Sequence, residues 1–168
     1  MSDLSGLSAQ MAFFDEGSET AVQFRENLEF MAVDMGNFYY GIELNYVKEL
    51  VRDPHITPVP CLPSYYEGVC NWKGNIIPVV SMRAAGGLPR EEVSQKLVLI
   101  AKAGGLECGF LVAGEPAIVG IAPDRELTGE LPEDGGIMLA VKQAFEGEDK
   151  IISVVDVDKS LKKMVVFE

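Results

Sequence analysis

An internal repeat constrains the fold of this chain of 168 residues more than any other feature of its sequence. Residues 28–44 align with residues 96–112, which lie 68 positions later. Residues 76–82 align in the same way with residues 151–157, at a distance of 75 positions. Repetition over such a distance indicates two similar structural units, although chance similarity between β-rich segments is the alternative.

Each repeat contains a hairpin, a third strand, a spacer and a closing pair of strands. Gly41 and Gly109 hold equivalent positions in the two hairpins. Five short, twisted strands close naturally into a small barrel. The sequence therefore predicts an all-β fold with a few short helices, in which two five-stranded β-barrels pack together, at about residues 28–82 and 95–157.

Residues 68–80 predict a hairpin that carries the most informative motif of the first repeat. Residues 69–72 and 76–80 are largely β-branched or aromatic runs of strand length, and Lys73-Gly74-Asn75 between them supplies a turn. Pro78 has no N–H to donate, so one side of the second strand must lie at an edge, at a bulge or beside a break in pairing. A hairpin with such an edge can present side chains to another protein.

Hydrophobic runs and turn residues predict the remaining elements. These are a hairpin over 28–44, a short helical turn that runs into a strand over 45–51, a hairpin over 95–113, a strand over 116–122, a hairpin over 137–155, a helical turn capped by Asp156 and reaching Leu161, and a terminal strand over 164–167. The predicted core positions are Phe30, Ala32, Ile42, Val69, Ile77, Val79, Leu97, Leu99, Phe110, Ile152 and Val154.

Two regions are distinguished by composition. Residues 1–27 predict an acidic N-terminal extension outside the main core, and residues 28–168 predict one domain in which the helix and tail at 158–168 pack back. The formal net charge is −12, and such a surface repels phosphate groups. Nucleic acids and anionic membrane surfaces are therefore not expected as partners.

The N-terminus has no basic start followed by an apolar run, and no segment approaches membrane-spanning length. We therefore expect no signal peptide and no direct membrane insertion. Cys61, Cys70 and Cys108 are an odd number without CxxC spacing, which suggests neither a disulfide framework nor a zinc site. Together these features favour a reducing cytoplasm.

Residues that could carry catalysis are scarce. His55 is the single histidine and lies in a proline-rich loop without a recognisable nucleophile or metal-ligand pattern beside it. The glycine pairs lie between predicted strands and not before a helix, where they could cradle a phosphate. We therefore predict no enzymatic activity, no cofactor and no metal ion.

The predicted turn combines a large amphipathic ring, Trp72, with a neighbouring cation, Lys73. Such residues dominate many protein interfaces. The alternative is that Trp72 closes the bottom of its barrel. Glu49, at the end of the 45–51 element, could pair with Lys73 if that element packs beside the hairpin.

Five segments of the chain together resemble the CheW family of bacterial chemotaxis coupling proteins, over about Leu28 to Leu161. They are Tyr40-Gly41-Ile42, Val47-Lys48-Glu49-Leu50, Pro60 to Pro63, Gly68-Val69-Cys70-Asn71-Trp72-Lys73-Gly74 and Ile77-Pro78-Val79-Val80. The resemblance implies two SH3-like barrels and a role as an adaptor between the cytoplasmic tip of transmembrane chemoreceptors and the regulatory domain of the histidine kinase CheA.

The resemblance, with the argument on Trp72, gives a set of expected partner-binding or surface-shaping residues: Val47, Glu49, Gly68, Asn71, Trp72, Lys73 and Gly74. The family usually has Arg where this chain has Lys73, an aliphatic residue in place of Trp72, and commonly Asp in place of Ser81. These departures suggest a divergent member, serving a specialised receptor set or a pilus or gliding pathway. A barrel that binds a small molecule is the alternative from another functional class.

Overall fold

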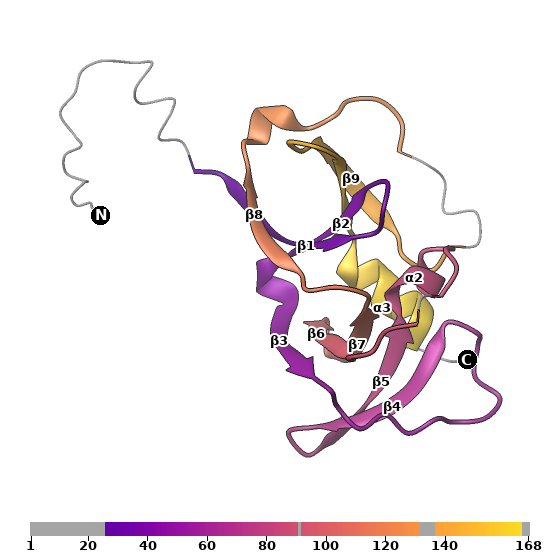
Figure 1. The fold of residues 1–168 in the computed structure, drawn as a ribbon. Coiled ribbons are helices and arrows are strands. Elements are labelled where there is room, and N and C mark those ends of the chain that lie inside the picture. Colours follow the sequence, from indigo (N-terminus) through magenta and orange to yellow (C-terminus); the bar gives the residue numbers. More distant parts are fainter. Residues whose placement is uncertain (1–25, 91, 132–136, 166–168) are drawn as a thin grey trace.

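Ten β-strands in two five-stranded sheets dominate the computed structural model, which describes residues 26–90, 92–131 and 137–165 (Figure 1). The first sheet contains, in spatial order, β8 (Ala117–Ile121), β1 (Leu28–Asp34), β2 (Tyr39–Glu43), β10 (Ile151–Val155) and β9 (Val141–Glu146). The second contains β3 (Val47–Arg52), β6 (Leu97–Ala103), β7 (Leu106–Val112), β5 (Asn75–Ser81) and β4 (Tyr66–Trp72). The helical elements are η1 (Leu44–Tyr46), α2 (Met82–Ala85), η2 (Pro123–Arg125) and α3 (Val157–Val165). The predicted all-β fold with two five-stranded SH3-like barrels is confirmed, and we call the barrels of the first and second sheets barrel A and barrel B.

Each barrel takes strands from both halves of the chain. Barrel A joins the β1–β2 hairpin to β8, β9 and β10, and barrel B joins the β6–β7 hairpin to β3, β4 and β5. The predicted division into barrels at 28–82 and 95–157 is therefore wrong. The two halves of the chain have the same order of strands. A barrel built from one half and a barrel that takes its hairpin from the other half therefore contain equivalent strands. The sequence pattern does not distinguish these two arrangements.

The pairing registers show that the repeat is structural. Gly41 of β2 lies opposite Val154 of β10, and Gly109 of β7 lies opposite Val79 of β5, both in parallel pairs. A Cβ atom on Gly41 would lie 2.8 Å from a β10 side-chain carbon, and one on Gly109 would lie 2.6 Å from a β6 side-chain carbon. Both barrels thus use a glycine at the same place because the strands leave no room for a side chain.

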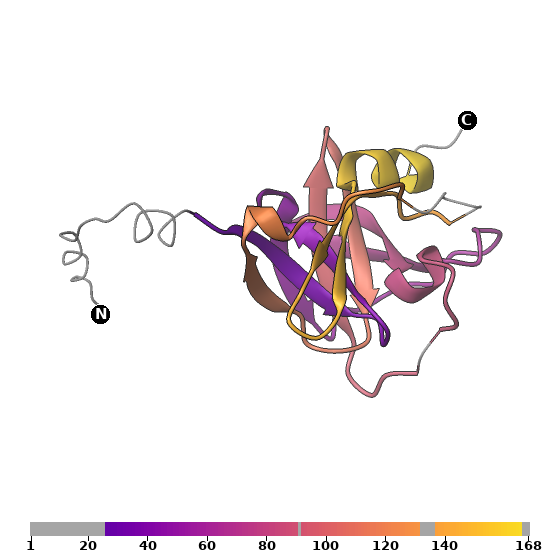
Figure 2. The same cartoon turned by 90° about the horizontal axis from the view of Figure 1, so that it is seen from above.

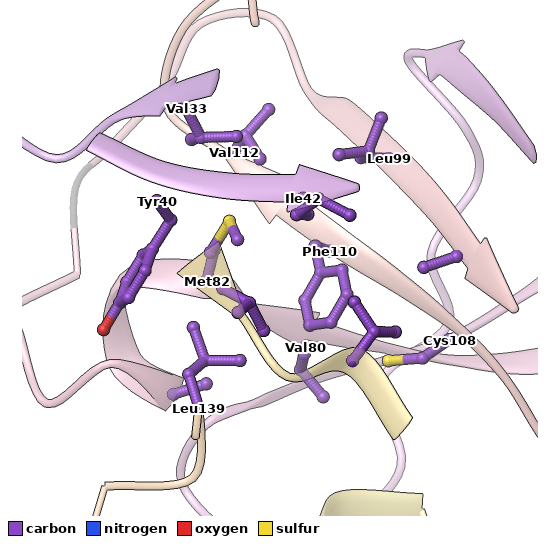
Figure 3. Packing of buried hydrophobic residues seen from close by; sticks show 14 of the residues in the cluster. Val33, Tyr40, Ile42, Val80, Met82, Leu99, Cys108, Phe110, Val112 and Leu139 are labelled. Carbon is purple, nitrogen blue, oxygen red and sulfur yellow. The ribbon is translucent and has the colours of Figure 1, made fainter. Parts of the chain in front are cut away.

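The main core lies where the two barrels pack together. Figure 3 shows side chains of barrel A beside side chains of barrel B in one buried cluster, which includes Val33, Tyr40, Ile42, Val80, Leu99, Phe110 and Val112. The predicted core positions are buried except Val69, which is only half-buried. That prediction is wrong by one residue, because alternation along β4 turns Cys70 inward and Val69 outward.

The C-terminal helix α3 lies beside β6 and β7 (Figure 2). As predicted, the Asp156 carboxylate caps it, accepting a hydrogen bond of 3.0 Å from the Lys159 amide. The predicted strand over 164–167 is wrong at Met164 and Val165, which belong to α3, and its last residues lie outside the described part. Buried side chains on one helical face, with Leu161 preceding Met164 by three positions, explain why this segment is a helix. The predicted extension at 1–27 also lies almost wholly outside the described residues.

Candidate docking surface

The turn between β4 and β5 has a conformation that its sequence requires. Lys73 and Gly74, its two central residues, have φ angles of 52° and 85°, which is the pattern of a type I′ turn between Trp72 and Asn75. The side-chain oxygen of Asn71 accepts a hydrogen bond of 3.2 Å from the Gly74 amide. Gly74 therefore makes the turn possible, and Asn71 holds it in place.

Trp72 connects the two edge strands of the second sheet, β3 and β4. Its indole Nε1 donates a hydrogen bond of 2.9 Å to Glu49 Oε1 on β3, and the Lys73 ammonium lies 5.2 Å from the centre of its ring. The predicted contact between Glu49 and Lys73 is wrong in its detail, because the acid and the cation each contact the indole. Since β3 and β4 are the outer strands of the sheet, this hydrogen bond helps to close barrel B.

The ring of Trp72 is half-buried against an apolar cluster inside barrel B that includes Cys70, Ile77 and Val79. Trp72 therefore closes the end of the barrel, as the second interpretation of this residue supposed. Part of the ring remains exposed, so this structural role is compatible with contact to a partner.

Gly68 is buried and lies behind the surface. Its φ is +142°, and a Cβ atom there would lie 2.2 Å from the carbonyl oxygen of Thr57. Thr57 forms two backbone hydrogen bonds with Val69, of 2.8 and 2.9 Å. Gly68 thus allows the loop containing Thr57 to pair with β4, and it shapes the surface without being part of its exposed area.

The beginning of β3 contributes the other predicted residues. Val47 is half-buried, and a β-bulge between Val47 and Glu49 shifts the register with β6. As a result both Lys48 and Glu49 are exposed. Val47 and Glu49 therefore lie on the edge of barrel B that Trp72 joins.

One exposed apolar residue was missed by the sequence argument. Ile76 lies opposite Asn71 at the start of β5, and it is 65% exposed. Alternation on β5 was the available signal, because burial of Ile77 places Ile76 on the outside. We define the B-turn surface as the half-buried or exposed residues Val47, Glu49, Asn71, Trp72, Lys73, Gly74 and Ile76.

Barrel B contains two buried cysteines, Cys70 and Cys108. Burial raises the pKa of the Cys70 thiol, and burial with the nearby Cys70 raises that of Cys108. Both thiols are therefore neutral and pack as small apolar groups. Within the described residues no three His, Cys, Asp or Glu side chains are grouped so that they could hold a metal ion. No helix in that same part of the chain is long and apolar enough to cross a membrane.

Comparison with known proteins identifies what this arrangement is similar to. The family model described as the CheW-like domain matches residues 29–164. A chemotaxis protein CheW from Thermotoga maritima is 24% identical over 151 residues, which cover 89% of this chain and 98% of that protein. Protein FrzA from Myxococcus xanthus is 32% identical over 62 residues, covering 37% of this chain and 39% of that protein. The structure of the scaffolding protein TtCheW from Thermoanaerobacter tengcongensis matches with a TM-score of 0.70 and 21% identity, over 81% of this chain and 93% of that one.

Proposed function

The chain belongs to the CheW family, and on that premise we propose that it is a non-enzymatic adaptor that couples bacterial chemoreceptors to a CheA-type histidine kinase. Its partners in this role are the cytoplasmic tip of a methyl-accepting chemoreceptor and the regulatory domain of the kinase. The adaptor is cytoplasmic and is recruited to receptor arrays at the membrane by these contacts.

One observation carries the proposal, namely the rigid and chemically mixed B-turn surface. The type I′ turn, the Asn71 hydrogen bond and the bond from Trp72 to Glu49 hold it before any partner binds. A preformed surface loses less conformational entropy on binding than a mobile one. Exposed Ile76 and exposed Lys73, in the same hairpin, also give the combination of apolar contact and charge that protein interfaces use.

The departures from the usual family sequence have structural explanations. Ser81 stands where Asp is common, and its Oγ accepts a hydrogen bond of 3.1 Å from the Ala84 amide, capping α2 as an Asp would. Trp72 replaces an aliphatic residue, and its indole reaches the Glu49 carboxylate. Lys73 replaces the usual Arg, so a partner carboxylate would contact a single ammonium group instead of a planar guanidinium that can donate two parallel hydrogen bonds. We therefore expect a narrower range of receptors than for an arginine-bearing member.

The experiment is a binding titration with the full chain against two partners from the same bacterium, the kinase regulatory domain and a soluble receptor-tip fragment. Lys73→Glu should weaken binding to at least one partner by about tenfold, because it replaces the exposed cation of the B-turn surface with an anion. The fold should be unchanged, because Lys73 is exposed and because lysine and glutamate have a similar energetic cost in a backbone conformation with positive φ.

Lys162→Glu is the matched control, because it makes the same charge change on the exposed face of α3. It should leave both affinities within about twofold of wild type. Wild-type affinity in Lys73→Glu would show that the B-turn surface is not the docking site. Absence of binding to both partners by the folded wild-type chain would overturn the adaptor itself. Binding to the kinase domain alone would point instead to a related pilus or gliding pathway.

A further inference from the structure

A hollow of about 510 Å³ lies at the end of barrel A. Its walls include Tyr39 and Ile152 from the inner strands, Ala117 and Val119 from β8, and Gly147 at the β9–β10 turn. This volume is in the range of sites that hold small organic molecules. The hollow lies on a different barrel from the B-turn surface, so an inference about it does not rest on the proposed function.

The internal repeat identifies the corresponding place in barrel B. Cys70 pairs with Ile77 across β4 and β5, and Phe145 pairs with Ile152 across β9 and β10, each residue exactly 75 positions after its counterpart. The register shifts in the two strand pairs also fall at matching places. A residue in one barrel end can therefore be compared directly with its counterpart in the other.

The hollow adjoins the residue of barrel A that corresponds to Trp72 in the repeat. The turn backbones differ at this point, because Lys73 and Gly74 have positive φ angles whereas Glu148 and Asp149 do not, and a Cβ atom on Gly147 would lie 2.5 Å from the Lys150 carbonyl oxygen. The counterpart of Trp72 is Gly147, and the counterpart of its hydrogen-bond acceptor Glu49 is Ala117. Barrel A has thus lost both the ring and the carboxylate that close barrel B.

A third substitution enlarges the same space. Ile100 on β6 of barrel B packs in the apolar cluster beneath Trp72, and its counterpart on β1 is Ala32. Ala32 is one of the residues that line the hollow. Three large-to-small differences thus lie around the hollow, while Phe30 and Phe145 of barrel A, the counterparts of Val98 and Cys70, fill the interior beneath it.

The turn at the end of barrel A also carries the opposite charge to the corresponding turn of barrel B. Where barrel B has Lys73 and Gly74, barrel A has Glu148 and Asp149, both exposed and both lining the hollow. Glu148 has no hydrogen-bond or ion-pair partner among the described residues. Asp149 accepts a hydrogen bond of 3.3 Å from the Tyr39 hydroxyl.

Two further carboxylates at the hollow already have cationic partners. Asp34 is 2.7 Å from the Lys150 ammonium, and Glu115 is held by both terminal nitrogens of Arg52. The Lys150 ammonium also lies 4.8 Å from the centre of the Tyr39 ring, close enough to act on Asp149. Four carboxylates nevertheless line the hollow against the two cations Arg52 and Lys150, so its rim keeps a negative charge, with Glu148 as the carboxylate without a cationic partner in the described part of the chain.

We propose that this hollow binds an aromatic ring that carries an ammonium group. Barrel B shows within the same chain how such an end is filled, by an indole with a carboxylate at its N–H and an ammonium above its face. In barrel A the ring lies between Ala32 and Val119, in the space that the small side chains leave. The ammonium lies at the rim, beside Glu148 and Asp149.

The test is a titration of the full chain, followed by amide NMR shifts and calorimetry, with two probes of this chemistry. Tryptamine represents a free aromatic amine, and the blocked peptide acetyl-Trp-Lys-Gly-amide represents a protein segment. Saturable shifts at the β8 and β9–β10 amides by either probe support the site, and the tighter probe identifies the source. Indole-3-propionate, which has the same ring and the opposite charge, should bind at least tenfold more weakly than tryptamine.

Variants distinguish the hollow from general surface binding. Ala117→Trp, at an exposed position of an outer strand, fills the space and should weaken binding of tryptamine by at least tenfold. Glu148→Gln combined with Asp149→Asn should weaken it several-fold without any demand on the fold, because both residues are exposed. Ile118→Trp, on the outer face of the same strand, is the matched control and should change nothing.

Three results would overturn the proposal. They are failure of both probes to saturate, equal binding of indole-3-propionate and tryptamine, and wild-type binding by folded Ala117→Trp. If Ala117→Trp does not fold, wild-type binding by the turn double variant overturns it.

Discussion

Barrel A and barrel B have the same strand order and matching registers, yet their ends differ. The strands keep the features that packing inside each barrel requires, including Gly41 and Gly109 in equivalent pairs. The end turns differ in side-chain size and in charge, with Trp72 and Lys73 in one and Gly147 and Glu148 in the other. The shared framework is set by burial, and the turns are where a duplicated barrel can acquire separate binding properties.

A second difference lies in the parallel ladders. In barrel A the pairing of β10 with β2 begins at Ile152. In barrel B the pairing of β5 with β7 begins at Val79, immediately after Pro78, although the counterpart of Ile152 is Ile77. Pro78 has no N–H and so delays the ladder, which confirms the predicted break in pairing beside this residue. On its other side Pro78 lies opposite Val69, whose backbone groups bond to Thr57.

Among substitutions that would distinguish the two barrels, Gly68→Ala is expected to have the largest effect on stability. Gly68→Ala places a methyl group 2.2 Å from the Thr57 carbonyl oxygen, at a φ that side chains rarely adopt. The loop can move away only by losing its hydrogen bonds to Val69. We expect the free energy of unfolding to fall by about 3 kcal/mol or more, measured by chemical denaturation.

The counterpart of Gly68 in barrel A is Gln143, which already carries a side chain. Its amide donates a hydrogen bond of 3.3 Å to Glu126 at the surface. Gln143→Ala should therefore change the free energy of unfolding by no more than about 0.5 kcal/mol. Equal effects of the two substitutions would mean that the loop at Thr57 does not constrain barrel B.

A smaller effect is expected from Trp72→Ala, which gives barrel B an open end like that of barrel A. The ring is half-buried, so its loss should lower the free energy of unfolding by about 2 kcal/mol. Water entering the cluster should also return the pKa of Cys70 toward its ordinary value, because burial is what raises it. In a Cys61→Ser background, which removes the exposed thiol, labelling of Cys70 should therefore be faster.

Ile76→Ala is the control for that prediction. Ile76 belongs to the same turn region but is 65% exposed, so its truncation should cost no more than about 0.5 kcal/mol. If Trp72→Ala were as stable as wild type and its Cys70 equally protected, the ring would not close the barrel.

The sequence predicted nearly all the strands because alternation and turn residues are local signals. The type I′ turn at Lys73-Gly74 and the turn of the first hairpin followed from their glycines. The partition of strands between barrels was not predictable in this way, since two similar halves offer equivalent pairing edges. Burial of Cys70 in place of Val69 is a shift of one residue, which changes the face of every side chain in a strand.

For the candidate surface, the sequence predicted which elements lie together better than it predicted the contacts between their side chains. It placed Glu49 beside the hairpin, but opposite charges suggested Lys73 as the partner, whereas the indole N–H of Trp72 occupies that position. The hollow in barrel A was not predicted, because its lining residues come from both halves of the chain. Ala32 meets Ala117 and Gly147 only because the β1–β2 hairpin of the first half pairs with strands of the second half. A repeat that aligns Trp72 with Gly147 contained the signal.

The smallest effect is expected at the charged pair that only barrel A has. The pKa of Asp34 lies below its ordinary value, chiefly because Lys150 donates a hydrogen bond to the carboxylate and then because the Gly36 amide does. Lys150→Asn introduces the barrel B residue, since Asn75 is the counterpart of Lys150. The pKa of Asp34 should then rise toward its ordinary value without reaching it, because the Gly36 bond remains. Carboxyl carbon shifts followed between about pH 2 and 6 measure this.

The same pair predicts a pH dependence whose sign is fixed. A carboxyl group with a lower pKa in the folded chain than in the unfolded chain stabilises the fold above the unfolded pKa, and this stabilisation is lost as the pH falls through the folded pKa. The small advantage of wild type over Lys150→Asn should therefore be present at neutral pH and shrink on acidification below about pH 4. Asn75→Ala, the matched change in barrel B, should leave the Asp34 titration unaltered. An Asp34 pKa that is the same with and without Lys150 would show that the Gly36 amide alone sets it, and that this charged pair does not distinguish the two barrels energetically.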